Sequence, residues 1–159
     1  MKKIFVVILL LVVANASIQA KAKKKSTKSD ISYISMHRSA CFGRCPDYKI
    51  EIYSNGLAKY SGYYFVKDSG VYEKNVGTAT ISKLFKEFES YRVDTCQKNY
   101  DQKIADFPGL YYVITYKGKT LEINNANFGP HFLMDLASIL DAAIKVDNSW
   151  KKTAKVATR

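Results

Sequence analysis

The chain turns at the sequence Cys41-Phe42-Gly43-Arg44-Cys45-Pro46-Asp47-Tyr48, which carries two of its three cysteines. Gly43 can adopt a positive φ at little cost, so the chain can reverse between the two cysteines. Pro46 disfavours helical backbone at Cys45, so the chain leaves the turn extended. Apolar and polar residues then alternate over residues 48–53, which is typical of a half-buried strand. We therefore expect a tight loop that leads into a strand.

The cysteines of this loop are the first candidates for a covalent bond. A disulfide between Cys41 and Cys45 would close a short loop and mainly fix its shape, because short loops remove little entropy from the unfolded chain. A bridge from either residue to Cys96 is the second possibility, and reduced or metal-bound thiols are the third. The sequence favours the pair Cys41 and Cys45 and leaves the other two open.

The same stretch resembles a known family. The motif Cys-Phe-Gly-x-Cys-Pro-x-Tyr, followed by Asn55-Gly56 and by Tyr60-x-Gly62, is similar to that of small secreted bacterial proteins grouped as a domain of unknown function. The resemblance runs from about residue 31 to about residue 145. It implies a secreted domain of that extent and implies no catalytic role.

The N-terminus has the layout of a secretory signal peptide. Lys2 and Lys3 precede an apolar run over residues 4–13, and Ala14-Asn15-Ala16 supplies small residues at the cleavage spacing. The run is shorter than the roughly 20 residues of a spanning helix. An uncleaved N-terminal anchor is the alternative. We expect a signal peptide over residues 1–16 and a secreted or periplasmic protein, in which a disulfide can persist.

The positive charge lies at the two ends of the chain. Of 25 Lys and Arg residues, two lie in the signal segment, five in a polar tether over residues 17–30, and four in a basic tail over residues 147–159. The 14 that remain are matched by all 14 Asp and Glu residues. A nucleic-acid-binding domain would carry its basic face on the folded body, so we expect no nucleic-acid partner. Weak contact of the basic tails with anionic surfaces remains open.

The body of the chain, residues 31–146, has the pattern of one α+β domain. Strands are expected at residues 31–36, 47–54, 57–66, 71–76, 110–116 and 120–124, and Asn55-Gly56 is a type I′ hairpin signal. Gly62 suggests a bulge or a close backbone approach. Helical spacing over residues 81–91, with Thr80 as N-cap, and after Pro130 predicts two helices. The order ββββαββα predicts an antiparallel sheet of about six strands with both helices packed on one face.

The twelve tyrosines and the loop suggest a contact surface. Tyrosine is enriched at recognition surfaces, so we expect binding through the loop and the exposed tyrosines of the sheet. The residues of this candidate surface are Phe42, Arg44, Tyr48, Tyr60 and Tyr63. Ordinary cross-strand aromatic pairing is the competing interpretation of the tyrosines. The predicted function is a disulfide-stabilised binding or interaction module without catalysis or cofactor, whose partner is an unknown protein or envelope polymer.

The alternative is a thiol-dependent redox or metal-dependent activity at Cys41 and Cys45. Arg38 or Arg44 could lower a thiol pKa, although the Cys-x-x-Cys spacing at a helix start is missing. A zinc site would combine the two cysteines with His37 and with Cys96 or His131.

A hydrolytic arrangement would join His131, Asp106 and Cys96, but nothing in the sequence places these three within hydrogen-bond reach.

Overall fold

The computed structural model describes residues 28–100 and 106–156. The expected signal peptide over residues 1–16 and most of the expected tether lie outside the described residues. The described chain folds in the order β1 (Ile31–Arg38), β2 (Asp47–Tyr53), β3 (Leu57–Tyr64), β4 (Gly70–Asn75), α2 (Thr78–Ser90), η1 (Val93–Thr95), β5 (Leu110–Tyr116), β6 (Lys119–Ile123), η2 (Ala126–Phe128), α3 (Phe132–Ala143) and β7 (Lys151–Ala154).

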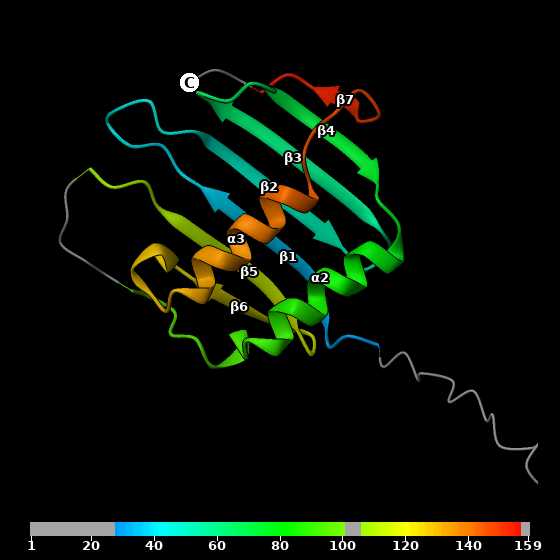
Figure 1. Cartoon of the computed structure of the whole chain (residues 1–159), viewed down its shortest axis with the longest axis vertical. Helices are drawn as coiled ribbons and strands as arrows, with labels where there is room; N and C mark the ends of the chain where they lie inside the picture. Colours follow the sequence, from blue (N-terminus) through cyan, green and yellow to red (C-terminus); the bar gives the residue numbers. More distant parts are fainter. Residues whose placement is uncertain (1–27, 101–105, 157–159) are drawn as a thin grey trace, which may run out of the picture.

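The strands form one sheet of seven, in the order β6-β5-β1-β2-β3-β4-β7, and every neighbouring pair is antiparallel. Figure 1 shows both long helices, α2 and α3, on the same face of this sheet. The predicted α+β class is confirmed. In the described ranges, no helix is long and apolar enough to cross a bilayer.

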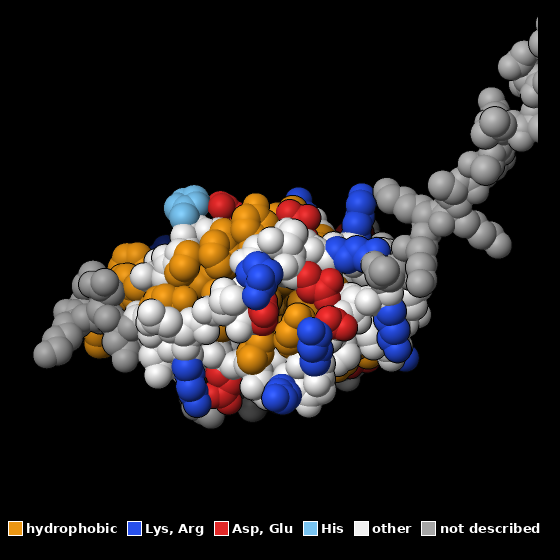
Figure 2. All heavy atoms as spheres, turned by 90° about the horizontal axis from the view of Figure 1, so that it is seen from below, with side chains coloured by type: hydrophobic (Ala, Val, Ile, Leu, Met, Phe, Trp, Pro, Cys, Tyr) orange, Lys and Arg blue, Asp and Glu red, His pale blue; other side chains and the backbone are white. Residues whose placement is uncertain are grey.

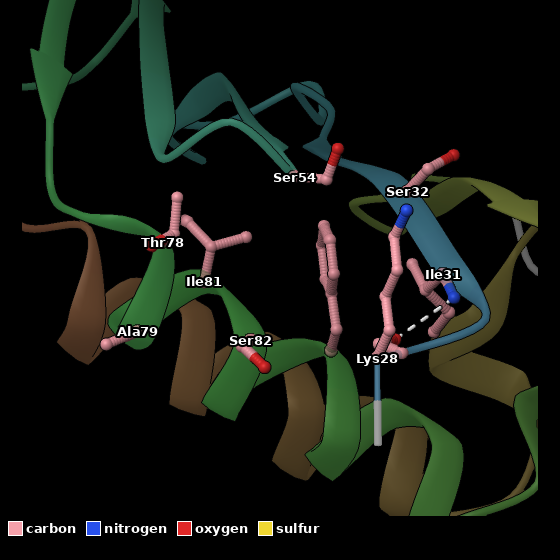
Figure 3. Close-up of a pocket in the computed structure, with 10 residues that line it drawn as sticks. Lys28, Ile31, Ser32, Ser54, Thr78, Ala79, Ile81 and Ser82 are labelled. Atoms are coloured by element: carbon pink, nitrogen blue, oxygen red, sulfur yellow. Dashed lines mark hydrogen bonds between the residues drawn. The ribbon is translucent and has the colours of Figure 1, made fainter. Parts of the chain in front are cut away.

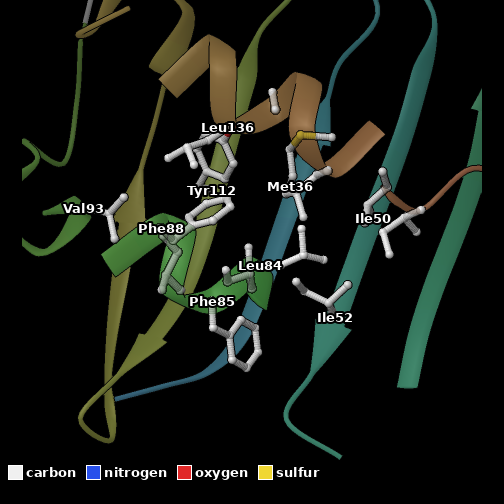
Figure 4. Close-up of a cluster of buried hydrophobic side chains, with 14 of the residues drawn as sticks. Met36, Ile50, Ile52, Leu84, Phe85, Phe88, Val93, Tyr112 and Leu136 are labelled. Carbon is white, nitrogen blue, oxygen red and sulfur yellow. The ribbon is translucent and has the colours of Figure 1, made fainter. Parts of the chain in front are cut away.

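Strand register decides which face of the sheet carries the core. Ile34 pairs with Ile52, and Met36 pairs with Ile50, so the side chains of these four residues leave the same face. All four are almost completely buried. Figure 4 shows Leu84, Phe85 and Phe88 of α2 and Leu136 of α3 pointing into this cluster. Burying an aliphatic or aromatic side chain of this size contributes roughly 1.5–3 kcal/mol, so these contacts hold the helices on the sheet.

The turn type predicted at Asn55-Gly56 is found at another hairpin of the sheet. The hairpin at Asn55-Gly56 is present, but Gly56 alone of the two has a positive φ, of 95°, so the predicted type I′ turn is wrong. Lys117 and Gly118 instead both have positive φ, of 49° and 73°, and connect β5 to β6 in two residues. Two positive φ values in a two-residue connection match the right-handed twist of the strands.

Gly62 marks a close approach, as the sequence predicted. A Cβ atom at this position would lie 2.3 Å from the carbonyl oxygen of Asp68, because the loop after β3 folds back over the strand. The β2–β3 register also shifts beside it, between Asp47 and Tyr48. A side chain at position 62 would therefore push the β3–β4 loop away from the sheet.

The seventh strand corrects the expected strand count. β7 lies inside residues 147–159, which the sequence assigned to a basic tail, and it pairs with the edge of β4. All four of its residues are exposed, so it carries no alternating pattern that sequence reasoning could detect. Trp150, just before it, is 8% exposed and donates from its indole Nε1 to the Lys145 carbonyl, at 3.1 Å.

The start of α2 is a second correction. The helix begins at Thr78 with Gly77 as its N-cap, and Thr80 lies in the first turn. The Asn75 side chain accepts the Gly77 N–H at 2.9 Å, which fixes the chain where it leaves β4.

Candidate functional site

Three loops meet at one end of the sheet because of strand register. The Ser39 N–H donates to the Gly109 carbonyl at 3.0 Å, which sets the end of β1 beside the start of β5. Asp47, at the start of β2, pairs with Tyr64, at the end of β3. The cysteine loop, the β3–β4 loop and residues 106–109 therefore flank the same end.

The disulfide between Cys41 and Cys45 is confirmed, with Cα atoms 5.5 Å apart. The Gly43 N–H lies 3.3 Å from the Cys41 Sγ, inside the turn. Across the end of the sheet, the Asp106 carboxylate accepts the Phe42 N–H. Ser39 Oγ accepts the Gly109 N–H at 2.9 Å. The loop is thus fixed by one covalent bond and by hydrogen bonds to the segment before β5.

Large apolar side chains protrude at this end. The exposed fractions are 92% for Phe42, 60% for Phe65 and 52% for Phe107, which come from the three loops in turn. We call these three residues the aromatic end. Phe107 lies against Phe128, with ring centroids 5.1 Å apart, and Ala40, Cys41, Phe42, Asp106 and Phe107 line a shallow hollow of about 320 Å³. Clustered exposed aromatic side chains mark an interaction surface more often than a free one.

Phe65 holds an unusual backbone conformation. Its φ is 51°, in the left-handed region, although it has a bulky side chain and is largely exposed. This conformation costs a non-glycine residue of the order of 1–2 kcal/mol, and such strain is concentrated at functional sites. Phe65 and Phe107 were missed by sequence reasoning. A single phenylalanine in a loop carries no periodicity, and its distance from Phe42 depends on strand register.

The predicted tyrosines fall on two different faces of the sheet. Tyr48 and Tyr60 lie on the helix-covered face, stacked with ring centroids 5.7 Å apart, and are half-buried. The Tyr48 hydroxyl donates to Asp141 Oδ1 at 2.6 Å, and the Arg38 guanidinium donates to Asp141 Oδ2 at 3.0 Å. Burial, and then the hydrogen bond to Asp141, raise the pKa of Tyr48.

Tyr60 lies beside Tyr72 on the next strand, with ring centroids 6.3 Å apart. Burial, followed by the charges of Asp68 and Asp141, raises the pKa of Tyr60 to about 12. Both rings therefore belong to cross-strand aromatic pairs, and Tyr48 joins the sheet to α3 through Asp141. They are not grouped with Phe42 on one open surface.

Tyr63 lies on the face without helices. Its ring approaches His37 at 6.1 Å, and His37 Nε2 lies 2.9 Å from Asp47 Oδ1. Further along this face, Glu51 accepts the Tyr33 hydroxyl at 2.7 Å and pairs with Lys49 Nζ at 3.1 Å. Burial opposes the charge of Glu51, but the hydrogen bonds from Tyr33 and Lys49 outweigh it and lower its pKa.

The residues that the sequence suggested for hydrolytic or metal-binding chemistry contact different partners in the structure. Cys96 is free and half-buried, and burial raises the pKa of its thiol. His131 pairs with Asp135 at 3.1 Å, while Asp106 binds the cysteine loop. The structure does not bring His131, Asp106 and Cys96 into one hydrogen-bonded arrangement. Across residues 28–100 and 106–156, no three or more His, Cys, Asp or Glu side chains are placed to hold a metal ion.

A larger hollow lies at the opposite end of the sheet. It has a volume of about 570 Å³, and Figure 3 shows Thr78 and Ser82 of α2 on one wall and Lys28 and Ser32 on the other. The Ile31 N–H donates to Ser29 Oγ at 3.0 Å beside it. Its lining has hydroxyl groups, one lysine and apolar side chains, and includes no acid, histidine or cysteine.

Figure 2 shows one face of the molecule, on which Lys and Arg side chains alternate with Asp and Glu side chains and hydrophobic side chains gather towards the left. No broad field of one charge covers this face. This mixture agrees with the equal numbers of basic and acidic residues, 14 each, in residues 29–150.

The comparisons with known proteins give one result. A family model described as a domain of unknown function, DUF6438, matches residues 32–144. This range begins in β1 and ends just after α3, so it contains the cysteine loop and excludes β7. No curated protein matches the chain.

Proposed function

The chain belongs to the DUF6438 family of domains of unknown function, and on that premise we propose that it is an exported, disulfide-stapled binding module without catalytic activity. The contact surface is the aromatic end, with Arg44 beside it. The partner is another component of the cell envelope.

One observation supports this proposal above the others: the 92% exposure of Phe42 at the tip of a fixed loop. An apolar ring held in water by a disulfide and by Asp106 gives nothing to the core, so folding does not explain it. A rigid loop also loses little conformational entropy when it binds, which favours recognition. Tyr48 and Tyr60 lie on the helix-covered face and pair with Asp141 and with each other, so they are not part of the proposed contact surface.

Site-specific photo-crosslinking in living cells tests the contact surface. Phe42 is replaced by a photoreactive phenylalanine analogue, and Val113, which is 37% exposed on the face without helices, is replaced in the same way as the control. We expect a defined covalent adduct from position 42 and a weaker or no adduct from position 113. Equal adducts from both positions, or none from position 42, would contradict the proposal.

Thiol counting separates the proposal from the thiol-dependent alternative. The oxidised protein should contain one thiol, Cys96, and a Cys41–Cys45 bridge that mild reductants leave intact. A bridge that opens and closes reversibly at moderate potential would favour redox chemistry instead.

A further inference from the structure

The aromatic end carries cations among its phenylalanines. Arg44 follows Phe42 by two residues, and Lys67 follows Phe65 by two residues, and both side chains are exposed. Among the described residues, neither forms an ion pair. Two loops at one end of the sheet therefore each offer an apolar ring and a free positive charge.

The last strand brings a third cation to the same end. Ala154 of β7 pairs with Val71, next to the first residue of β4, so Lys155 emerges beside the β3–β4 loop. Among the described residues, the acidic side chains at this end are Asp68, which is partly buried, Asp106, which accepts the Phe42 N–H, and Asp141, which pairs with Arg38. Asp47 is paired with His37. In the described part of this end, the exposed charges without an ion-pair partner are thus positive.

From this juxtaposition we propose that the aromatic end docks on the surface of an anionic phospholipid bilayer. Phe42 and Phe65 enter the boundary between headgroups and acyl chains, and Arg44 and Lys67 contact lipid phosphates. Apolar burial together with attraction to anionic lipid is the general basis of interfacial binding. This inference rests on the proposed function, because it names the partner of the same surface.

The arrangement fits a bilayer better than a protein partner. Phe42 is almost fully exposed and Phe65 and Phe107 mostly so, on three separate loops. A protein partner would need a pocket matched to each ring, whereas a lipid interface accepts apolar side chains without matched pockets. The free cations next to Phe42 and Phe65 would also cost desolvation in a protein interface but remain hydrated at headgroup level.

Vesicle co-sedimentation tests this inference with the protein as recovered after export. The vesicles contain phosphatidylglycerol and phosphatidylethanolamine, and pure phosphatidylcholine vesicles are the comparison. We expect binding to the anionic vesicles that weakens with added salt, and little binding to phosphatidylcholine. The double variant Phe42→Ser/Phe65→Asn should bind the anionic vesicles at least about tenfold more weakly than the parent protein. The control Val113→Ser should bind as the parent does.

Two further variants locate the contact. Arg44→Glu/Lys67→Glu should lose binding to anionic vesicles while far-ultraviolet circular dichroism stays unchanged. Phe42→Trp should show a blue-shifted emission and quenching by brominated lipid, whereas Val113→Trp should show neither. Trp150, which is already buried, supplies a constant background that the parent protein measures.

Three outcomes would overturn the inference. These are no binding by the parent protein, equal binding by Phe42→Ser/Phe65→Asn, and an unquenched Trp at position 42. If position 42 still crosslinks to one protein while vesicles do not bind, the bilayer inference fails and the proposed function stands. If position 42 gives no adduct of any kind, both fail.

Discussion

Phe65 combines exposure with backbone strain, so its replacement should separate stability from binding. The change Phe65→Asn places at φ 51° a residue that tolerates the left-handed region. We expect the free energy of unfolding to rise by about 0.5–1 kcal/mol, because the relieved strain exceeds the loss of a ring that is 60% exposed. Urea denaturation measures the change.

The matched control is Phe42→Asn, which removes an exposed ring from a residue without a positive φ. It should leave the free energy of unfolding within about 0.5 kcal/mol of the parent value. If Phe65→Asn instead destabilises the protein, the ring packs more strongly on its loop than its exposure suggests. The backbone strain would then be compensated by packing and would not indicate a functional site.

Glu51 gives the face without helices a dependence on pH. Its pKa is lowered in the folded protein, so its ionised form stabilises the fold at any pH above the unfolded value of about 4.3. This contribution should be lost as the pH falls below about 4.3, through the lower pKa of the folded state. The variant Glu51→Gln lacks the titration, so the stability difference between parent and variant should shrink over that acid range.

Thermal unfolding of both proteins between neutral pH and pH 3 measures this difference. The variant Glu122→Gln is the control. Glu122 is much more exposed than Glu51, and its ion pair with Lys98 lies at the surface, where such pairs contribute little to stability. A gap between parent and Glu51→Gln that stays constant down to pH 3 would show that the Tyr33 and Lys49 contacts do not depend on the charge.

The residues of the candidate site could be predicted only in part from the sequence. Phe42 and Arg44 follow from a short loop closed by two cysteines, because a loop of that length has no room to bury them. Tyr63 was grouped with Tyr48, and the structure separates them because the β2–β3 bulge and the register decide the face. The partner of Tyr48, Asp141, lies 93 residues away, and no local pattern indicates it.

Among the elements, β7 has the least support from the core. All four residues are exposed, and its backbone pairs with β4 across three residue pairs and one register shift. Ending the chain after Trp150 should therefore cost little core stability, but it opens the edge of β4. Unpaired edge groups are a template for another strand, so we expect the truncated protein to self-associate. Sedimentation velocity over a range of concentrations measures the association.

A chain that ends after Ala154 is the control, because it keeps β7 and removes only the residues beyond it. It should sediment as the parent protein does. If the chain that ends after Trp150 also matches the parent, the edge of β4 is protected by something other than β7.

The helices and strands that bury side chains could be predicted from the sequence, whereas β7, which buries none, could not. Residues 110–116 were predicted as β5 with its observed bounds, because alternate residues of this strand are buried. The two helices were predicted from their apolar spacing, which matches the buried residues of α2 and α3. β7 is held by backbone hydrogen bonds to β4. Because every residue other than proline has the same backbone groups, such bonding leaves no pattern in the sequence from which β7 could be predicted.

The whole molecule has one core and an uneven distribution of charge. The buried apolar residues form one cluster that includes both helices and five of the seven strands, so the described body has the single core expected of one domain. In residues 29–150, the 14 Lys and Arg residues equal the 14 Asp and Glu residues in number. Long-range attraction to polyanions should therefore come mainly from the ends of the chain, whereas Arg44 and Lys67 of the folded body act at contact range.

Trimming both ends tests this division of charge. Residues 17–159 contain 23 basic and 14 acidic residues, whereas residues 29–155 contain 17 and 14. We expect the longer protein to bind double-stranded DNA weakly at low salt, with an affinity that falls steeply as salt rises, because such binding depends on counterion release. The trimmed protein should bind DNA at least tenfold more weakly, which a fluorescence polarisation titration measures. Equal binding by the two proteins would place a basic nucleic-acid-binding surface on the folded body. That result would contradict the expectation, based on equal numbers of basic and acidic residues in the body, that nucleic acid is not a partner.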